Sequence, residues 1–116
     1  MTNNNEKDPN GIDQHAGGAK LDHGKPRMSL VLNAFALALI EVSKVGTFGA
    51  NKYSDNGWKE VKDGESRYAD AMLRHHFYEA TGEEYDSDTD LLHAAHRAWN
   101  ALAVLQKIVL RKKQEE

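Results

Sequence analysis

The 116-residue chain contains no cysteine. It therefore cannot form disulfides, thiolate zinc sites or a cysteine nucleophile. An excess of basic side chains is absent as well, because 18 acidic residues against 15 basic ones leave a formal charge of -3. A surface that binds a nucleic-acid backbone needs clustered Lys and Arg, so we expect no nucleic-acid partner. The length is that of one ordinary domain.

The sequence also has little that could enter a membrane. Its most apolar stretch, 30–42, is shorter than the roughly 20 residues that cross a bilayer, and Asn33 and Glu41 interrupt it. No apolar run follows a basic patch at the N-terminus, so a signal peptide is not expected. These features predict one soluble, cytoplasmic domain without a membrane partner.

Composition divides the chain into three segments. Residues 1–24 have no periodic apolar pattern and are rich in Asn and Gly, which is typical of a flexible arm. The ordered domain is expected over 25–112, with a charged tail at 113–116. Cations gather where the arm meets the domain, and they could bind an anion, although such runs are usually only solvated: Lys20, Lys25 and Arg27.

Hydrophobic periodicity predicts three main helices, near 28–45, 66–80 and 89–112. The first is apolar nearly all round, and a helix without a polar face must be covered on every side. We therefore expect it to contact another subunit in a homodimer or homotetramer. Gly46 and Gly49 are expected to end this helix. No strand alternation is present, so the predicted fold is an all-α bundle that oligomerisation completes.

The segment 48–58 is expected to form a structured loop between the first two helices. Asn56 and Gly57 are a turn signal within it. It contains three aromatic side chains, Phe48, Tyr53 and Trp58. Exposed rings would leave a large apolar area in water, so we expect them to pack on the helices or on a ligand.

Three polar side chains share one face of the third predicted helix. His93, His96 and Asn100 stand at i, i+3 and i+7, which places them on the same side. Two imidazoles and an amide could bind a metal or a phosphate, or they could simply be the solvated face. The residues alone leave both interpretations open. An apolar stripe through Ala95 and Leu102 is expected to face the core instead.

Carboxylates on the first two helices need partners. Glu41 stands alone in an apolar run, and because burying an unpaired charge is costly, it requires a lysine, a histidine or a metal. His75 and Glu79 lie one turn apart near an apolar boundary, a placement that attracts cations. Oxygen ligands of this kind suit Mg²⁺, and four of them could meet in one cleft: Glu41, Asp70, Glu79 and Asp86.

Three segments of the sequence, taken together, are specific. They are 18–27, 48–53 followed by Trp58, and 68–76 continued through 81–86 to 93–100. With these segments the chain resembles the phage dATP/dGTP diphosphohydrolases, MazZ-like proteins grouped with the MazG-type all-α nucleoside triphosphate pyrophosphohydrolases. MazG-type enzymes carry Glu-x-x-Glu and Glu-x-x-Asp metal motifs, which are not intact here. His93-x-x-His96 stands at the place of the second motif, so the resemblance leaves a metal site that is either rebuilt with histidines or absent.

The resemblance implies hydrolysis of a purine deoxynucleoside triphosphate, dGTP or dATP, to the monophosphate and pyrophosphate, in the cytoplasm of a phage-infected host. Mg²⁺ or Mn²⁺ would activate the attacking water, with Glu79, His93 and His96 as the catalytic groups. A non-catalytic helical module that binds a protein or a small regulator is the alternative. The expected substrate contacts are Lys20, Lys25, Arg27, Lys52, Tyr53, Trp58, Arg74 and Asn100.

Overall fold

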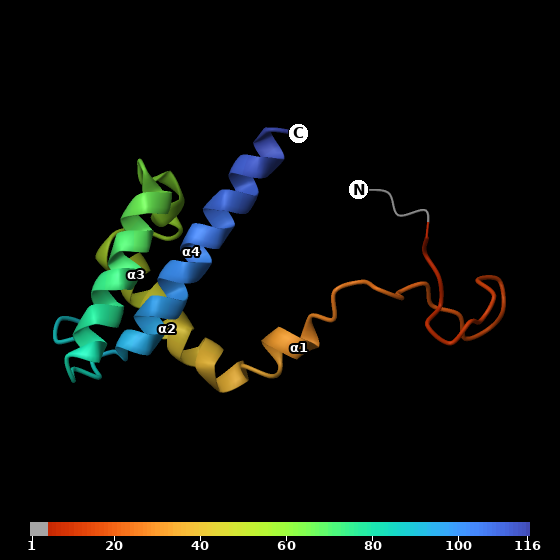
Figure 1. Ribbon diagram of the computed structural model, residues 1–116, viewed down its shortest axis with the longest axis horizontal. Coiled ribbons are helices and arrows are strands. Elements are labelled where there is room, and N and C mark those ends of the chain that lie inside the picture. The colour runs from red at the N-terminus through yellow and green to blue at the C-terminus, as the bar shows by residue number, and fades with distance from the viewer. Residues whose placement is uncertain (1–4) are drawn as a thin grey trace. The chain divides into compact units, whose positions relative to one another are not determined.

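The structure is a computed structural model that describes residues 5–116, and it is helical (Figure 1). The predicted all-α class is confirmed, because the described residues form helices and a single isolated β-bridge but no strand. The chain divides into two compact units, 1–34 and 35–116. Among residues 5–116, no helix combines the length and the apolar character that crossing a membrane requires.

The first unit is organised around a buried carboxylate. Asp8 is 7% exposed, and its Oδ2 accepts the backbone N–H of Lys20 at 2.9 Å while its Oδ1 accepts that of Asn10 at 2.7 Å. The N–H of His23 donates to the Lys7 carbonyl at 3.0 Å. These bonds tie residues 7–23 into a closed loop, which precedes the short helix α1 (Ser29–Leu32).

The helix predicted over 28–45 is interrupted, so its description as one helix was wrong. Helix α1 ends at Leu32, and helix α2 (Ala36–Lys52) begins after three residues of turn. At the interruption the N–H of Ala34 donates to the Ser29 carbonyl, five residues back, at 3.2 Å. Phe35 then leaves helical geometry with φ -105° and ψ 27°. Apolar composition alone did not reveal this change of hydrogen-bond register.

Gly46 and Gly49 do not end helix α2, contrary to expectation. The helix continues through both to Lys52. Gly46 lies against α4 (His93–Gln114), where an added Cβ would stand 3.3 Å from Trp99 Nε1. The missing side chain therefore lets α2 approach α4 closely.

Helices α3 (Gly64–Ala80) and α4 lie side by side and run in opposite directions (Figure 1). Three aromatic rings pack edge-to-face and join both helices to the 3₁₀ turn η1 (Gly57–Glu60). The ring centroids of Trp58 and Tyr68 are 6.2 Å apart, and each lies 5.6 Å from that of Trp99. The Tyr68 hydroxyl also donates to the Trp58 carbonyl at 3.3 Å. Trp58 thus has a packing role.

The expected core face of the third helix was partly wrong. Ala95 is buried, but Leu102 is 50% exposed. The buried face of α4 carries instead the predicted polar residues together with Ala103. Small and polar side chains let α3 and α4 approach, which leaves large apolar side chains outside: Leu73, Phe77, Leu102, Leu105 and Val109.

Replacing Gly46 by Leu should destabilise the fold, because the new side chain would overlap the Trp99 ring. Overpacking of this kind costs about 1–3 kcal/mol. Gly49→Leu is the matched control, since a Cβ there meets nothing within 4 Å and helix propensity improves by several tenths of a kcal/mol. Urea unfolding followed by circular dichroism measures both. Equal midpoints for the two variants would contradict the close approach.

Candidate functional site

The turn 81–92 joins α3 to α4 (Figure 1). A cluster of polar side chains lies near this turn. Helix α3 contributes one histidine, the start of α4 contributes two, and the turn supplies the remaining groups. We call it the histidine cluster, and its members are His75, Glu83, Asp86, Thr89, His93 and His96.

His93 is the centre of this cluster. Its side chain is completely buried, and both ring nitrogens have partners. Nδ1 lies 2.8 Å from Nδ1 of His75, and Nε2 lies 3.2 Å from Glu83 Oε1. Because a carboxylate only accepts, the Nε2–H of His93 donates to Glu83.

His96 is oriented by the turn and by His75. The Thr89 hydroxyl donates to Asp86 Oδ2 at 2.9 Å and lies 2.7 Å from His96 Nε2. Since a hydroxyl has one proton, the Nε2–H of His96 must donate to Thr89. The rings of His96 and His75 stack with centroids 4.2 Å apart and planes 4° apart.

Backbone hydrogen bonds fix the turn that carries the acidic groups. The N–H of Asp86 donates to the Leu91 carbonyl at 2.8 Å, and the N–H of Asp90 donates back to the Asp86 carbonyl at 2.8 Å. The N–H of His93 donates to the Glu84 carbonyl at 2.9 Å. The third helix therefore starts at His93 rather than near residue 89, because residues 89–92 belong to this turn.

Burial determines the charge state of the cluster. Burial and then the neighbouring His96 lower the pKa of His75 from 6.5 to about 4. Burial also lowers the pKa of His96, although the Asp86 carboxylate partly offsets the effect. For Asp86, burial opposes ionisation, but the Thr89 hydrogen bond and His96 outweigh it and lower the pKa. At neutral pH, an ionised carboxylate therefore lies beside neutral imidazoles.

Part of the cluster has the composition of a metal site. Within the described residues 5–116, one group of three or more potential ligands has all its donor atoms within 4.8 Å of one another. It consists of His75, Asp86 and His93.

A groove of about 480 Å³ runs along α2 and reaches the cluster. Thr89 lines this groove and also bonds Asp86 and His96. A ligand in the groove would therefore lie next to the cluster. The other lining residues are Ile40, Ser43, Lys44, Thr47, Phe48, Asn51 and Leu91.

The predicted polar face of α4 is brought into this site. His93, His96 and Asn100 are all at most 7% exposed, so their interpretation as a solvated face was wrong. Asn100 uses its Nδ2–H to donate to the His96 carbonyl at 2.8 Å. This bond lies within α4 and gives the buried Asn100 amide a partner.

The four carboxylates expected to bind metal lie in different surroundings. Glu41 Oε1 pairs with Lys44 at 2.9 Å, which is the lysine alternative. Glu79 Oε1 pairs with Arg97 at 2.7 Å, and Asp70 is exposed on α3. Of the four, Asp86 is the one that belongs to the group of close donors.

The expected substrate contacts also fall in separate places. Arg74 precedes His75 on α3 and is exposed, while Lys52 lies over the Tyr53 ring, 5.3 Å from its centroid. Three cations belong to the first unit: Lys20, Lys25 and Arg27.

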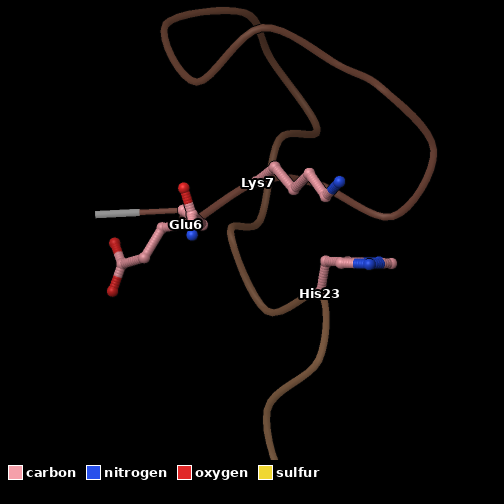
Figure 2. A pocket seen from close by; sticks show the side chains of 4 residues that line it. Glu6, Lys7 and His23 are labelled. Atoms are coloured by element: carbon pink, nitrogen blue, oxygen red, sulfur yellow. The ribbon is translucent and has the colours of Figure 1, made fainter. Parts of the chain in front are cut away.

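The first unit has a hollow of its own, of about 540 Å³, lined by Asn5, Glu6, Lys7 and His23. Figure 2 shows the Lys7 and His23 side chains on one side and Glu6 pointing to the other. Glu6 Oε1 lies 3.6 Å from Lys25 Nζ. This ion pair gives Lys25 a partner within its own unit.

Sequence reasoning missed the roles of Glu83 and Thr89 and the partner of His75. His75 was expected near an apolar boundary, in a pair with Glu79 that attracts cations, but not as a partner of His93, from which it is 18 positions away. Glu83 and Thr89 sit in an acidic, polar turn, where nothing in the local pattern distinguishes them from solvated residues. A search for polar groups pairing across α3 and α4 could have found His75.

Comparison with known proteins gives a family and one curated relative. The chain matches the family described as dATP/dGTP diphosphohydrolase, N-terminal, over residues 15–116. A Salmonella phage PMBT28 protein named dATP/dGTP diphosphohydrolase is 36% identical over 81 residues, which make up 70% of this chain and 26% of the relative. The match thus spans about a quarter of that relative's length. No solved structure matches significantly.

The metal-free protein should lose stability as the pH falls from about 6.5 to about 4. In that window His75 binds a proton in the unfolded chain but not in the folded one, so acid favours unfolding. His75→Gln should flatten the dependence of the unfolding free energy on pH. His76→Gln changes the exposed neighbouring histidine and should leave this dependence unchanged. Urea unfolding in EDTA at several pH values measures this. An unchanged slope in His75→Gln would contradict the burial of a neutral imidazole.

Proposed function

The chain belongs to the dATP/dGTP diphosphohydrolase N-terminal family, and from this premise we propose that it hydrolyses a purine deoxynucleoside triphosphate, dGTP or dATP, to the monophosphate and pyrophosphate. The proposed place of action is the cytoplasm of a phage-infected host, because the matched relative comes from a phage. The observation that carries the proposal is the groove along α2 that ends at the histidine cluster through Thr89.

The groove offers the two kinds of surface that a nucleotide needs. Phe48 supplies an apolar ring that is 39% exposed, on which a purine can stack. Lys44 and Asn51 supply polar groups along the same wall. A volume of about 480 Å³ also lies in the usual range of small-molecule sites. The phosphates would then lie toward Thr89.

The cluster supplies groups for proton transfer. Because His96 donates Nε2–H to Thr89, its Nδ1 carries the lone pair and can accept the proton of an attacking water. Asp86, ionised and bonded to the same hydroxyl, stabilises the imidazolium that results. The Arg74 guanidinium, one residue from His75, would balance charge on the phosphate oxygens.

A divalent ion of the expected kind, Mg²⁺ or Mn²⁺, would polarise the phosphate and make water more acidic. The donor atoms that could hold one are those of His75, Asp86 and His93, since they lie within 4.8 Å of one another. Of these groups, the Asp86 carboxylate is the ligand that such an ion prefers, whereas the two imidazoles suit a softer ion.

We further propose that the chain acts as a homodimer or homotetramer. Large apolar side chains remain on the surface of one chain, including Leu37, which is 83% exposed, and Phe77, which is 68% exposed. Val45, Ala95 and Ala103 are its buried apolar residues within 5–116. Contact between copies would remove the exposed apolar area from water.

The wild-type chain should release pyrophosphate from dGTP or dATP in the presence of Mg²⁺ or Mn²⁺. His96→Ala should lower the rate by about 100-fold or more, because it removes the proton acceptor. His76→Ala, at an exposed position of α3, should keep the wild-type rate, and circular dichroism should show that both variants are folded. If no purine deoxynucleoside triphosphate releases pyrophosphate, the proposal is contradicted and the non-catalytic module is favoured. The incomplete carboxylate motifs support that alternative.

Leu37→Glu should shift the chain toward a smaller assembly, because a charge at an apolar contact is costly to desolvate. Ser66→Glu adds the same charge at an exposed polar position of α3 and should leave the assembly intact. Light scattering after gel filtration gives the masses. A monomeric wild-type chain, or identical masses for the two variants, would contradict association through α2.

A further inference from the structure

We propose that His75, His93 and Asp86 form the binding site of a divalent first-row transition-metal ion, and that Glu83 orients His93 for this role. The use of the ion in hydrolysis rests on the proposed function, whereas the binding site is argued from geometry alone. It differs from the all-carboxylate magnesium site that the sequence suggested.

The distances suit one shared ion. Nδ1 of His75 and Nδ1 of His93 are 2.8 Å apart. Two nitrogens bound to one ion at about 2.0–2.1 Å each lie about 2.9 Å apart at right angles and about 3.3 Å apart in tetrahedral geometry, so the two rings would need to separate by at most about 0.5 Å. The Asp86 carboxylate has an oxygen within 4.8 Å of a ring nitrogen of each histidine and can supply the third ligand.

Glu83 gives His93 the protonation state of a ligand. Its carboxylate lies 3.2 Å from Nε2 and accepts the proton there, so the lone pair of His93 is on Nδ1, which points to His75. Histidines that bind metals commonly donate their other N–H to a carboxylate in this way. Since His93 is completely buried, its ring is held in this orientation.

Two Nδ1 lone pairs cannot face each other at this distance unless a proton or a cation lies between them. With His93 Nδ1 unprotonated, the 2.8 Å contact requires a proton on Nδ1 of His75. If that proton moves to Nε2 of His75, the two Nδ1 lone pairs face each other, and a cation can replace the shared proton. Metal binding thus exchanges one hydrogen bond for two coordinate bonds.

The other two ligands are also oriented by fixed neighbours. The Thr89 hydroxyl donates to Asp86 Oδ2 at 2.9 Å, which sets the plane of that carboxylate. The His96 ring stacks on His75 with a centroid distance of 4.2 Å, which restrains rotation of the imidazole. Outer contacts of this kind hold ligands in place before the ion arrives.

The donor set selects the class of ion. Imidazole nitrogen suits zinc, copper, iron and nickel, whereas Mg²⁺ prefers oxygen donors and retains several waters. Two imidazoles and one carboxylate therefore favour a transition ion such as Zn²⁺ or Co²⁺ over Mg²⁺. Two nearby carboxylates, Asp86 and Glu83, balance the charge of a divalent ion.

Titration of the full, metal-free chain with Co²⁺ tests the site directly. Nitrogen ligation should produce visible absorption that saturates at one ion per chain, and Zn²⁺ should displace Co²⁺ whereas Mg²⁺ should not. Asp86→Asn and His75→Gln should each weaken Co²⁺ binding by more than about 100-fold, since each removes or neutralises a ligand, while Glu83→Gln should weaken it by about 10–100-fold.

His76→Gln is the matched control, because His76 is the exposed neighbour of His75 on α3. It should bind Co²⁺ as the wild-type chain does. Circular dichroism must show that each variant is folded. Glu83→Gln tests the role of His93 without a cavity at the buried position of His93. Unsaturable Co²⁺ binding, unchanged affinity in His75→Gln, or equally tight Mg²⁺ binding would overturn the proposed site.

Hydrolysis assays on the same samples separate this inference from the proposed function. One saturating ion without release of pyrophosphate would support the metal site and contradict the hydrolase. If the chain binds no Co²⁺ but His75→Gln still releases pyrophosphate with Mg²⁺, the hydrolase is supported and the metal site is contradicted.

Discussion

The pairing of both ring nitrogens of His93 constrains the arrangement of α3, α4 and the turn between them. A buried polar atom without a partner costs about 1–3 kcal/mol, and His93 is completely buried. Its partners come from two different places, His75 on α3 and Glu83 in the turn. Sliding one helix along the other would break at least one of these contacts. The polar bonds therefore fix the register of α3 against α4, which packing of small residues alone would not determine.

This arrangement places polar groups inside and large apolar groups outside. Ala95 and Ala103 lie on the buried face of α4 with the histidines, while Leu102 and Leu105 are about half exposed. The ring cluster that includes Trp99, three residues after His96 on α4, supplies the larger apolar contact of the helix pair. A chain built in this way gains from covering its outer face, which accounts physically for the association proposed above.

The histidine cluster and the groove both belong to the unit 35–116. Thr89 links them, because its side chain lines the groove and bonds the cluster. The groove and the titratable groups of the cluster are therefore adjacent within one unit. The match spans about a quarter of the length of the Salmonella phage relative.

Periodicity determined the all-α class and the positions of α3 and α4 to within a few residues, since these patterns are local. The face with His93, His96 and Asn100 was also evident from spacing. Local patterns did not show that this face is buried, or that Gly46 continues a helix instead of ending it, because both depend on what α3 and α4 present to each other. The pairing of His75 with His93 was decided by the tertiary structure alone, since a hydrogen bond between helices depends on how their backbones pack and not on sequence spacing.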